Sequence, residues 1–125
     1  PPPGPAGPTP KLWEHEVVEL FVLGDDQRYT EIELNPHGHH LVLQLDGIRN
    51  IVAAELPLTF DATIAGDRWT GVATLDRALL PSPPRKCNVY RVAGAGPTRR
   101  WQALVDVPGE KPDFHRLDRF APWPL

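Results

Sequence analysis

Three glutamates stand close together near the start of the chain, in the stretch K-L-W-E-H-E-V-V-E-L-F-V at residues 11–22. Glu14, Glu16 and Glu19 follow Trp13 and run into an apolar, strand-like segment. Carboxylates beside a tryptophan suit four roles: acid or base catalysis, metal binding, hydrogen bonding to a sugar, or a solvated strand face. Which of these roles applies depends on the strands and turns that position the three carboxylates.

Alternate residues of an extended strand share one face. One face of the strand after Trp13 carries only the apolar Val18, Leu20 and Val22, and we expect it to be core. Glu19 then lies on the opposite face with Phe21 as a neighbour. The three glutamates therefore do not form one catalytic set.

A carboxylate among apolar neighbours must be paired or hydrogen-bonded. The expected partners of Glu19 are Arg91, a tyrosine hydroxyl or the hydroxyls of a ligand. Glu19 is thus predicted to be an acceptor in a binding face or one half of a buried pair. Glu14 and Glu16 precede the apolar run and can stay solvated.

A second pair of carboxylates, Glu31 and Glu33, lies two residues apart on a strictly alternating segment. The strand rise separates them by roughly 6.6 to 7 Å. A glycosidase needs two carboxyl groups on opposite sides of the scissile bond, whereas these two point the same way. We interpret this face as a polar or ligand-facing strand surface.

Histidines cluster in the stretch N-P-H-G-H-H at residues 35–40. Their spacing fits no common zinc pattern, and a turn is a poor frame for tetrahedral geometry. We expect a turn between two antiparallel strands, with His39 and His40 partly exposed and no metal bound. No nucleophile elbow or phosphate loop is present, so the sequence predicts neither an enzyme nor a cofactor.

Strand signals dominate from Leu12 onward. Short β-branched or alternating segments, separated by turn residues, lie at 16–23, 28–34, 41–46, 49–56, 58–65, 68–76, 87–93 and 99–107. This spacing is typical of an all-β sandwich or barrel. Residues 76–84 can support one helical turn before prolines end it. Residues 1–11 form a proline-rich extended linker or surface loop, and residues 12–125 form one domain.

Composition excludes several classes of protein. The net charge is −3 without a basic stripe, which argues against a nucleic-acid partner. No run of 18 apolar residues is present, so no membrane span is expected. The single cysteine, Cys87, excludes a disulfide framework and is expected to be buried.

Four stretches in this order resemble the family 9 carbohydrate-binding modules, which belong to the DOMON-like β-sandwiches. They are W-E-H-E-V-V-E-L-F from residue 13, Y-T-E-I-E-L-N-P-H-G from 29, C-N-V-Y-R-V from 87 and D-F-H-R-L-D-R-F from 113. The motifs L-W-x-x-E-V-V-E, E-L-x-P-H-G-x-H-L-V-L and K-P-D-F-H resemble more closely an uncharacterised group of intracellular eukaryotic proteins with that fold.

The resemblance implies a non-catalytic, antiparallel, jelly-roll-like β-sandwich that binds a sugar or a glycan end. In the family, two tryptophans clamp the sugar ring. Trp13 matches the first clamp residue and Glu19 a prominent acid, while Phe114 stands at the second clamp position. Tyr90 occupies a late-strand amide position, and Arg91 follows it.

Two further expectations follow from the resemblance. Complete modules begin with strands before the tryptophan, so we expect N-terminal strands to be missing here and supplied by upstream residues or another chain. The intracellular group implies a cytoplasmic location. The alternative function is a structural or protein-interaction module that has kept the fold and lost the sugar.

Overall fold

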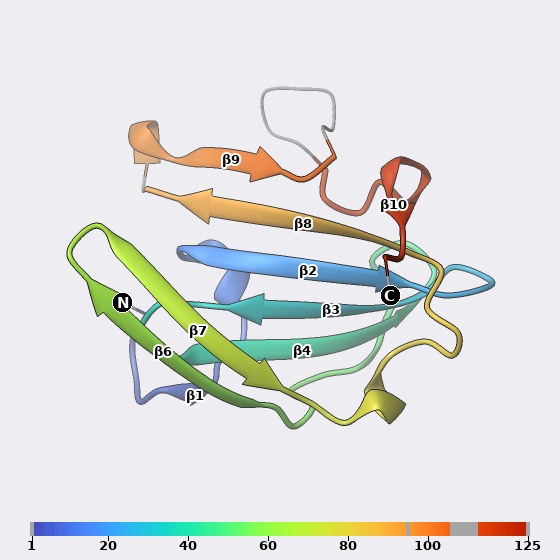
Figure 1. Cartoon of the computed structure of the whole chain (residues 1–125), viewed down its shortest axis with the longest axis horizontal. Helices are drawn as coiled ribbons and strands as arrows, with labels where there is room; N and C mark the ends of the chain where they lie inside the picture. Colours follow the sequence, from blue (N-terminus) through green and yellow to red (C-terminus); the bar gives the residue numbers. More distant parts are fainter. Residues whose placement is uncertain (1, 95, 106–112, 125) are drawn as a thin grey trace.

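A computed structural model describes residues 2–94, 96–105 and 113–124. These residues form an all-β, sandwich-like fold, as the sequence predicts (Figure 1). The strands are β1 (Gly7–Pro8), β2 (Val17–Leu23), β3 (Arg28–Leu34), β4 (His39–Asp46), β5 (Ile51–Ala53), β6 (Thr59–Ala65), β7 (Arg68–Thr74), β8 (Lys86–Ala93), β9 (Arg100–Ala103) and β10 (Ala121–Pro122). Eight of them, β2 to β9, overlap the eight predicted segments, although β5 and β9 are shorter than predicted. Residues 106 and 107 of the last predicted segment lie outside the described residues.

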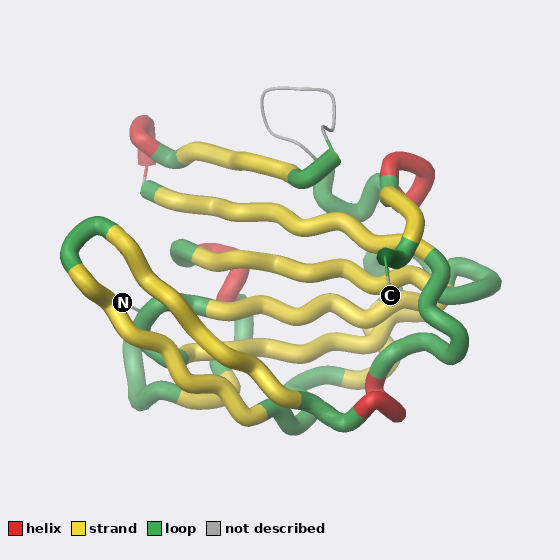
Figure 2. The backbone as a smooth tube through the Cα atoms, in the orientation of Figure 1, coloured by secondary structure: helices red, strands yellow, loops and turns green. Residues whose placement is uncertain are grey.

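The helical residues of the described chain are single 3₁₀ turns in the connections (Figure 2). They are η1 (Leu12–Glu14), η2 (Arg77–Leu79), η3 (Gly96–Thr98) and η4 (Leu117–Arg119). The turn predicted within residues 76–84 is η2, and the Asp76 side chain caps it by accepting a hydrogen bond from the Ala78 backbone. No helix in the described residues is long and apolar enough to cross a membrane.

The larger sheet has the strand order β1-β4-β3-β2-β8-β10, with β5 beside β4 and β9 beside β8. Its central pairs are antiparallel, as predicted. The short β1 is parallel to β4, so the proline-rich start of the chain is attached along the sheet edge. Proline hides both β1 and β10 from a search for strand signals, because each contains one and is only two residues long.

The hairpin of β6 and β7 forms a second, two-stranded sheet that crosses one face of the larger sheet (Figure 1). We call this the hairpin face. The ring of Phe60 on β6 lies edge-on to that of His40 on β4, with centroids 6.4 Å apart. The Leu79 carbonyl in η2 accepts hydrogen bonds from the side chains of Thr30 and Gln44, at 2.6 and 3.1 Å.

The opposite face of the larger sheet carries the main hydrophobic core. Phe21 at its centre is fully buried and packs edge-on against the rings of Tyr90 and Phe120, with centroids 5.3 and 5.9 Å away. The prediction that the Val18 face of β2 is core is therefore right only in part: Val22 on that face is fully buried, but the larger cluster lies on the Glu19 face. Segments distant in sequence cover the Glu19 face, while Val18 is only half-buried.

The turn at residues 35–38 is confirmed, but the exposure predicted for the histidines after it is wrong. The Asn35 side chain accepts a hydrogen bond from the His37 backbone, and Gly38 adopts a φ of 91°, which favours glycine. His39 and His40 begin β4 and are only 3% and 7% exposed. The segment with β1 covers His39, whose Nδ1 lies 2.8 Å from Thr9 Oγ1.

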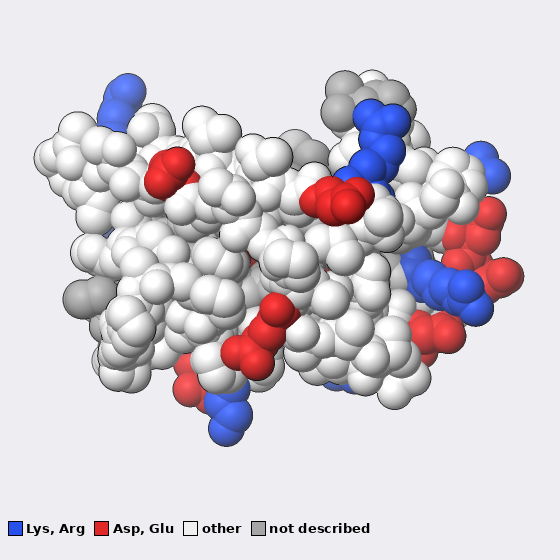
Figure 3. Space-filling model, turned by 90° about the horizontal axis from the view of Figure 1, so that it is seen from below, with Lys and Arg blue, Asp and Glu red and all other residues white. Residues whose placement is uncertain are grey.

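The surface seen in Figure 3 is largely uncharged, with side chains of both signs scattered over it. Cys87 is buried, as expected, and burial raises the pKa of its thiol.

Candidate functional site

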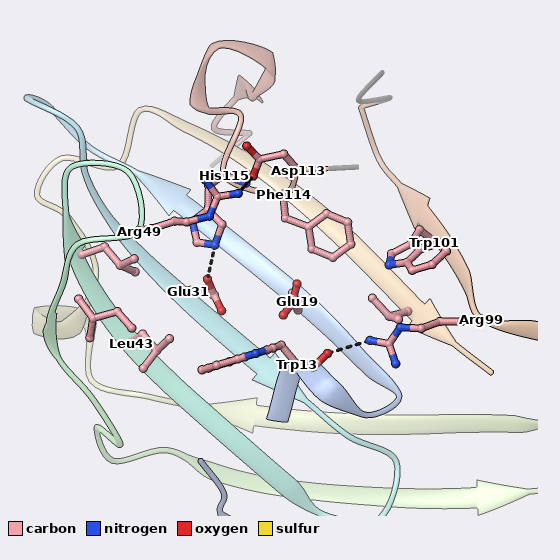
Figure 4. Close-up of a pocket in the computed structure, with 13 residues that line it drawn as sticks. Trp13, Glu19, Glu31, Leu43, Arg49, Arg99, Trp101, Asp113, Phe114 and His115 are labelled. Atoms are coloured by element: carbon pink, nitrogen blue, oxygen red, sulfur yellow. Dashed lines mark hydrogen bonds and ion pairs between the residues drawn. The ribbon is translucent and has the colours of Figure 1, made fainter. Parts of the chain in front are cut away.

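A cavity of about 420 Å³ opens on the core-bearing face, which we call the cavity face (Figure 4). Strands β2, β3, β4, β8 and β9 form its base, and the loop after β4, the η1 segment and residues 113–115 form its rim. The residues that line it are Trp13, Glu19, Glu31, Leu43, Leu45, Arg49, Ile51, Val92, Arg99, Trp101, Asp113, Phe114 and His115.

Aromatic rings stand on two sides of the cavity. Trp13 in η1 is 41% exposed, and Phe114 and Trp101 lie across from it (Figure 4). The Phe114 ring stacks on Tyr90 with centroids 3.9 Å apart and an interplanar angle of 14°. The Tyr90 hydroxyl also donates a hydrogen bond to the Phe114 carbonyl at 2.9 Å, which fixes this wall to β8.

Arg99 ties the Trp13 side of the cavity to the β8–β9 side. Its guanidinium donates hydrogen bonds to the backbone carbonyls of Trp13 and Glu14, at 2.8 and 3.1 Å. The same guanidinium lies 5.9 Å from the centre of the Trp101 ring, within range of a cation–π interaction. Trp13 is therefore exposed but anchored through its backbone.

A cluster of three carboxyl groups lies at the bottom of the site. Glu19 and Glu33 are directly opposite each other on β2 and β3, and Glu31 points to the same face two residues before Glu33. One oxygen of each group lies within 4.8 Å of one oxygen of each of the others. All three side chains are buried, at 3% exposure or less.

Burial shifts the ionisation of this cluster. It raises the pKa of Glu19 to about 8, and the neighbouring Glu31 charge adds to that rise. Burial and the adjacent Glu31 and Glu19 carboxyls raise the pKa of Glu33 to about 12. Burial also raises the pKa of Glu31. Near neutral pH the cluster therefore holds protons that ordinary glutamates release.

The His115 side chain lies across the cavity from Trp13 and points toward Glu31 of the cluster (Figure 4). Its Nδ1 lies 2.6 Å from the Tyr29 hydroxyl, and its Nε2 lies 3.6 Å from Oε1 of Glu31. Burial, together with the positive charge of Arg49, lowers the pKa of His115 to about 4. The imidazole is therefore neutral at physiological pH. Arg49 itself forms an ion pair with Asp113 at the rim.

The structure brings together three of the five residues predicted for the site. Trp13, Glu19 and Phe114 all line the cavity. Tyr90 is fully buried behind Phe114 and supports it rather than facing the cavity. Arg91 points to the other side of the sheet, where its guanidinium donates to the Gln102 side chain at 3.0 Å. It is not the partner of Glu19.

Several residues of the site were missed at the sequence level. Glu31 was interpreted as part of a polar or ligand-facing strand surface, and it does line the cavity, whereas Glu33 lies fully buried beneath. The sequence pattern assigns no site role to Trp101 or His115. In the register of β2 with β3 and β8, Glu33 and Tyr90 both lie opposite Glu19. That register would have identified them as neighbours of Glu19, but it cannot be derived from the sequence alone.

Together these features define an all-β, sandwich-like domain with a concave site of aromatic walls and a buried carboxyl floor. No protein-family model matches the chain, and no solved structure matches it. The chain belongs to the UPF0462 (C4orf33) family. It is 44% identical to the UPF0462 protein C4orf33 homolog of Mus musculus, an alignment that covers 98% of this chain and 69% of the mouse protein.

Other relatives agree with this assignment. The Danio rerio homolog is 41% identical, over 99% of this chain and 68% of the relative. The Homo sapiens protein is 42% identical, over 95% of this chain and 65% of the relative. The resemblance to a group of uncharacterised eukaryotic proteins is thereby confirmed.

Proposed function

We propose that this domain is a non-catalytic module that binds a sugar, or the sugar end of a glycan, in the cavity. The observation that carries the proposal is the combination of facing aromatic walls with a polar floor in one cavity of about 420 Å³. That size lies within the range of cavities that hold small molecules. Trp13 is exposed, so its ring is accessible to a ligand.

A sugar ring has the two kinds of surface that such a cavity recognises. Its apolar face stacks on an indole or phenyl ring, and its hydroxyls need both donors and acceptors of hydrogen bonds. Trp13, Trp101 and Phe114 offer the rings. A carboxyl with a pKa of about 8, such as Glu19, is largely protonated at pH 7 and can both donate to and accept from a hydroxyl.

The proposal agrees with the resemblance of the chain to the family 9 carbohydrate-binding modules. In that family a second tryptophan completes the clamp, whereas this chain has Phe114 at that position. Trp101 lines the same cavity and adds an indole to that side. By the same resemblance to intracellular proteins, we propose a cytoplasmic location.

A second candidate function is a protein-interaction module that has kept the fold without binding a sugar. Exposed apolar side chains on the β6–β7 hairpin favour it: Ile64 is 48% exposed and Val72 is 71% exposed. Such residues are common singly on protein surfaces, so they support this candidate less strongly than the cavity supports the first.

A glycan array followed by calorimetry with the best ligand tests the proposal. We expect saturable binding that weakens at least tenfold in Trp13→Ala and in Phe114→Ala, because each loses a stacking surface. Trp69→Phe on β7 is the matched control, since Trp69 lies on the hairpin and does not line the cavity. Binding that is absent, or unaffected by both cavity variants, would favour the interaction module.

A further inference from the structure

Glu33 occupies an unusual position beneath the cavity. It is 0% exposed, and its carboxyl oxygens have no hydrogen-bond partner apart from the carboxyl groups of Glu19 and Glu31. Both Glu19 and Glu31, which do line the cavity, present an oxygen within 4.8 Å of it. Oε1 of Glu31 is also buried without a hydrogen-bond partner.

Buried polar groups in folded proteins are almost always hydrogen-bonded, and buried charges are paired or coordinate a metal. A fully buried carboxyl whose only partners are two other carboxyls meets these conditions only while the cluster keeps shared protons. Shared protons would neutralise the cluster at the cost of leaving acceptor oxygens unused. A bound cation would neutralise it and use those oxygens as ligands.

We propose that a divalent transition-metal ion, Mn²⁺ or Zn²⁺, binds between Glu19, Glu31 and Glu33, with Nε2 of His115 as the fourth ligand. Oxygen and nitrogen atoms that share one such ion at about 2.0 to 2.2 Å lie roughly 3 to 3.5 Å from each other. The distance of 3.6 Å from Nε2 to Glu31 Oε1 is close to this range. The carboxyl oxygens, within 4.8 Å, need only a small closure.

The surroundings of His115 resemble those of a metal-binding histidine. Such a histidine usually donates its other ring N–H to an oxygen, which fixes the tautomer and directs the free nitrogen at the metal. The Tyr29 hydroxyl, 2.6 Å from Nδ1, can accept that hydrogen. The hydroxyl is itself held by the backbone N–H of Arg49, which donates to it at 3.0 Å.

The ligand set indicates which ions fit. Three carboxylates with one imidazole suit Mn²⁺ or Zn²⁺, whereas Ca²⁺ prefers six to eight oxygen ligands. Arg99 lines the same cavity as Glu19, so a divalent ion and this guanidinium together balance three carboxylates. Glu19 and Glu31 face the cavity, which provides the entry path.

The experiment is calorimetric titration of the EDTA-treated chain with Mn²⁺ and, separately, with Zn²⁺ and Ca²⁺, in the absence of any sugar. We expect one Mn²⁺ or Zn²⁺ ion per chain, with Ca²⁺ at least tenfold weaker. Electron paramagnetic resonance of the Mn²⁺ complex should show the loss of the free-ion signal at the same stoichiometry.

The variants Glu33→Gln and His115→Gln should each weaken this binding at least tenfold, while Glu14→Gln leaves it unchanged. Glu14 is the matched control because it is an exposed glutamate close to the same cavity. Glutamine keeps the shape of Glu33 and removes its ionisation, and thermal unfolding verifies that the variant is folded. If Glu33→Gln is unfolded, the metal affinity of His115→Gln is the deciding measurement, and an affinity equal to that of the control overturns the proposal.

The absence of stoichiometric binding, or equal affinity in Glu33→Gln and the control, would overturn the proposal. The metal site uses part of the same cavity but does not depend on a sugar. A sugar titration carried out in EDTA therefore reports on the proposed function separately, so failure of one proposal is not failure of the other.

Discussion

The two faces of the larger sheet differ in how their buried polar groups are hydrogen-bonded. On the hairpin face, Thr30 and Gln44 both donate to the Leu79 carbonyl, and only Nδ1 of His40 is buried without a partner in the described residues. On the cavity face, both oxygens of Glu33 and one of Glu31 have no hydrogen-bond partner outside the carboxyl cluster. Yet this second face carries the main hydrophobic core.

This difference separates structural polar groups from candidates for function. A partnered polar group inside a protein contributes modestly to stability, whereas an unpartnered one costs free energy. A cluster of buried carboxyls that have only one another as partners, beside an open cavity, is thus costly for folding and available to a ligand. The hairpin face holds the second layer in place, and the cavity face offers the site.

The largest expected effect tests which face is the core. Phe21→Ala removes a fully buried ring on the cavity face and should lower the free energy of unfolding by about 3 to 5 kcal/mol. Leu20→Ala removes a half-buried side chain on the hairpin side of the same strand and should cost about 1 to 2 kcal/mol. Denaturant unfolding measures both, and equal losses would contradict our assignment of the faces.

The next effect concerns the support of the Phe114 wall. Asn88 on β8 donates to the Tyr90 hydroxyl and to the Val105 carbonyl, both at 3.1 Å, and accepts from the Val105 backbone N–H at 3.0 Å. Asn88→Ala should lower the free energy of unfolding by about 2 to 3 kcal/mol, because these buried groups lose their partner. Thermal and denaturant unfolding give the value, and a loss below 0.5 kcal/mol would show that the network is not needed.

The third effect is the pH dependence of the free energy of unfolding, measured on the metal-free protein. Glutamates with a raised pKa in the folded state bind more protons there than in the unfolded chain, so stability falls as pH rises toward the folded pKa. Between pH 6.5 and 8 the free energy of unfolding should fall by on the order of 2 kcal/mol for each carboxyl that keeps its proton. Glu33, with its pKa of about 12, keeps its proton throughout this interval.

His115 does not obscure this measurement. Its pKa is lowered to about 4, so it destabilises the fold only as pH falls below the ordinary histidine value near 6.5. Glu33→Gln should therefore flatten the profile between pH 6.5 and 8 and be more stable than the wild type at pH 8. A flat wild-type profile would contradict the assignment of buried protonated carboxyls.

The smallest effect lies on the hairpin face. Thr30→Val keeps the shape of the side chain and removes the hydrogen bond to the Leu79 carbonyl. We expect a loss of about 1 kcal/mol in the free energy of unfolding and no change in ligand affinity. Calorimetry with a cavity ligand checks the second expectation, and a tenfold change in affinity would show that the two faces are coupled.

The strands were predictable because their signals are local. Alternation in residues 28–34 and the β-branched run around Val17 identify β3 and β2 directly, and Asn35 with Gly38 identifies the turn. That the larger core lies on the Phe21 face was not predictable, since Phe21 is buried by Phe120 and by other residues about a hundred positions away. An apolar pattern on one side of β2 does not show which side the rest of the chain will cover.

The site was predictable only in part, for the same reason. Trp13, Glu19 and Phe114 came from resemblance, and they meet at one cavity. The carboxyl cluster depends on the register that sets Glu33 opposite Glu19, which the turn between β2 and β3 determines. His115 joins it from a distant segment that carries no periodic signal.

The central claim is that a sugar binds on the cavity face. Mapping amide and indole chemical shifts by nuclear magnetic resonance, during titration with the best ligand from the array, tests it most directly. We predict shifts at Trp13, Trp101 and Phe114 that saturate together, and none at Trp69 on the hairpin. Saturating shifts confined to the β6–β7 hairpin, or none at any of the cavity residues, would contradict the claim.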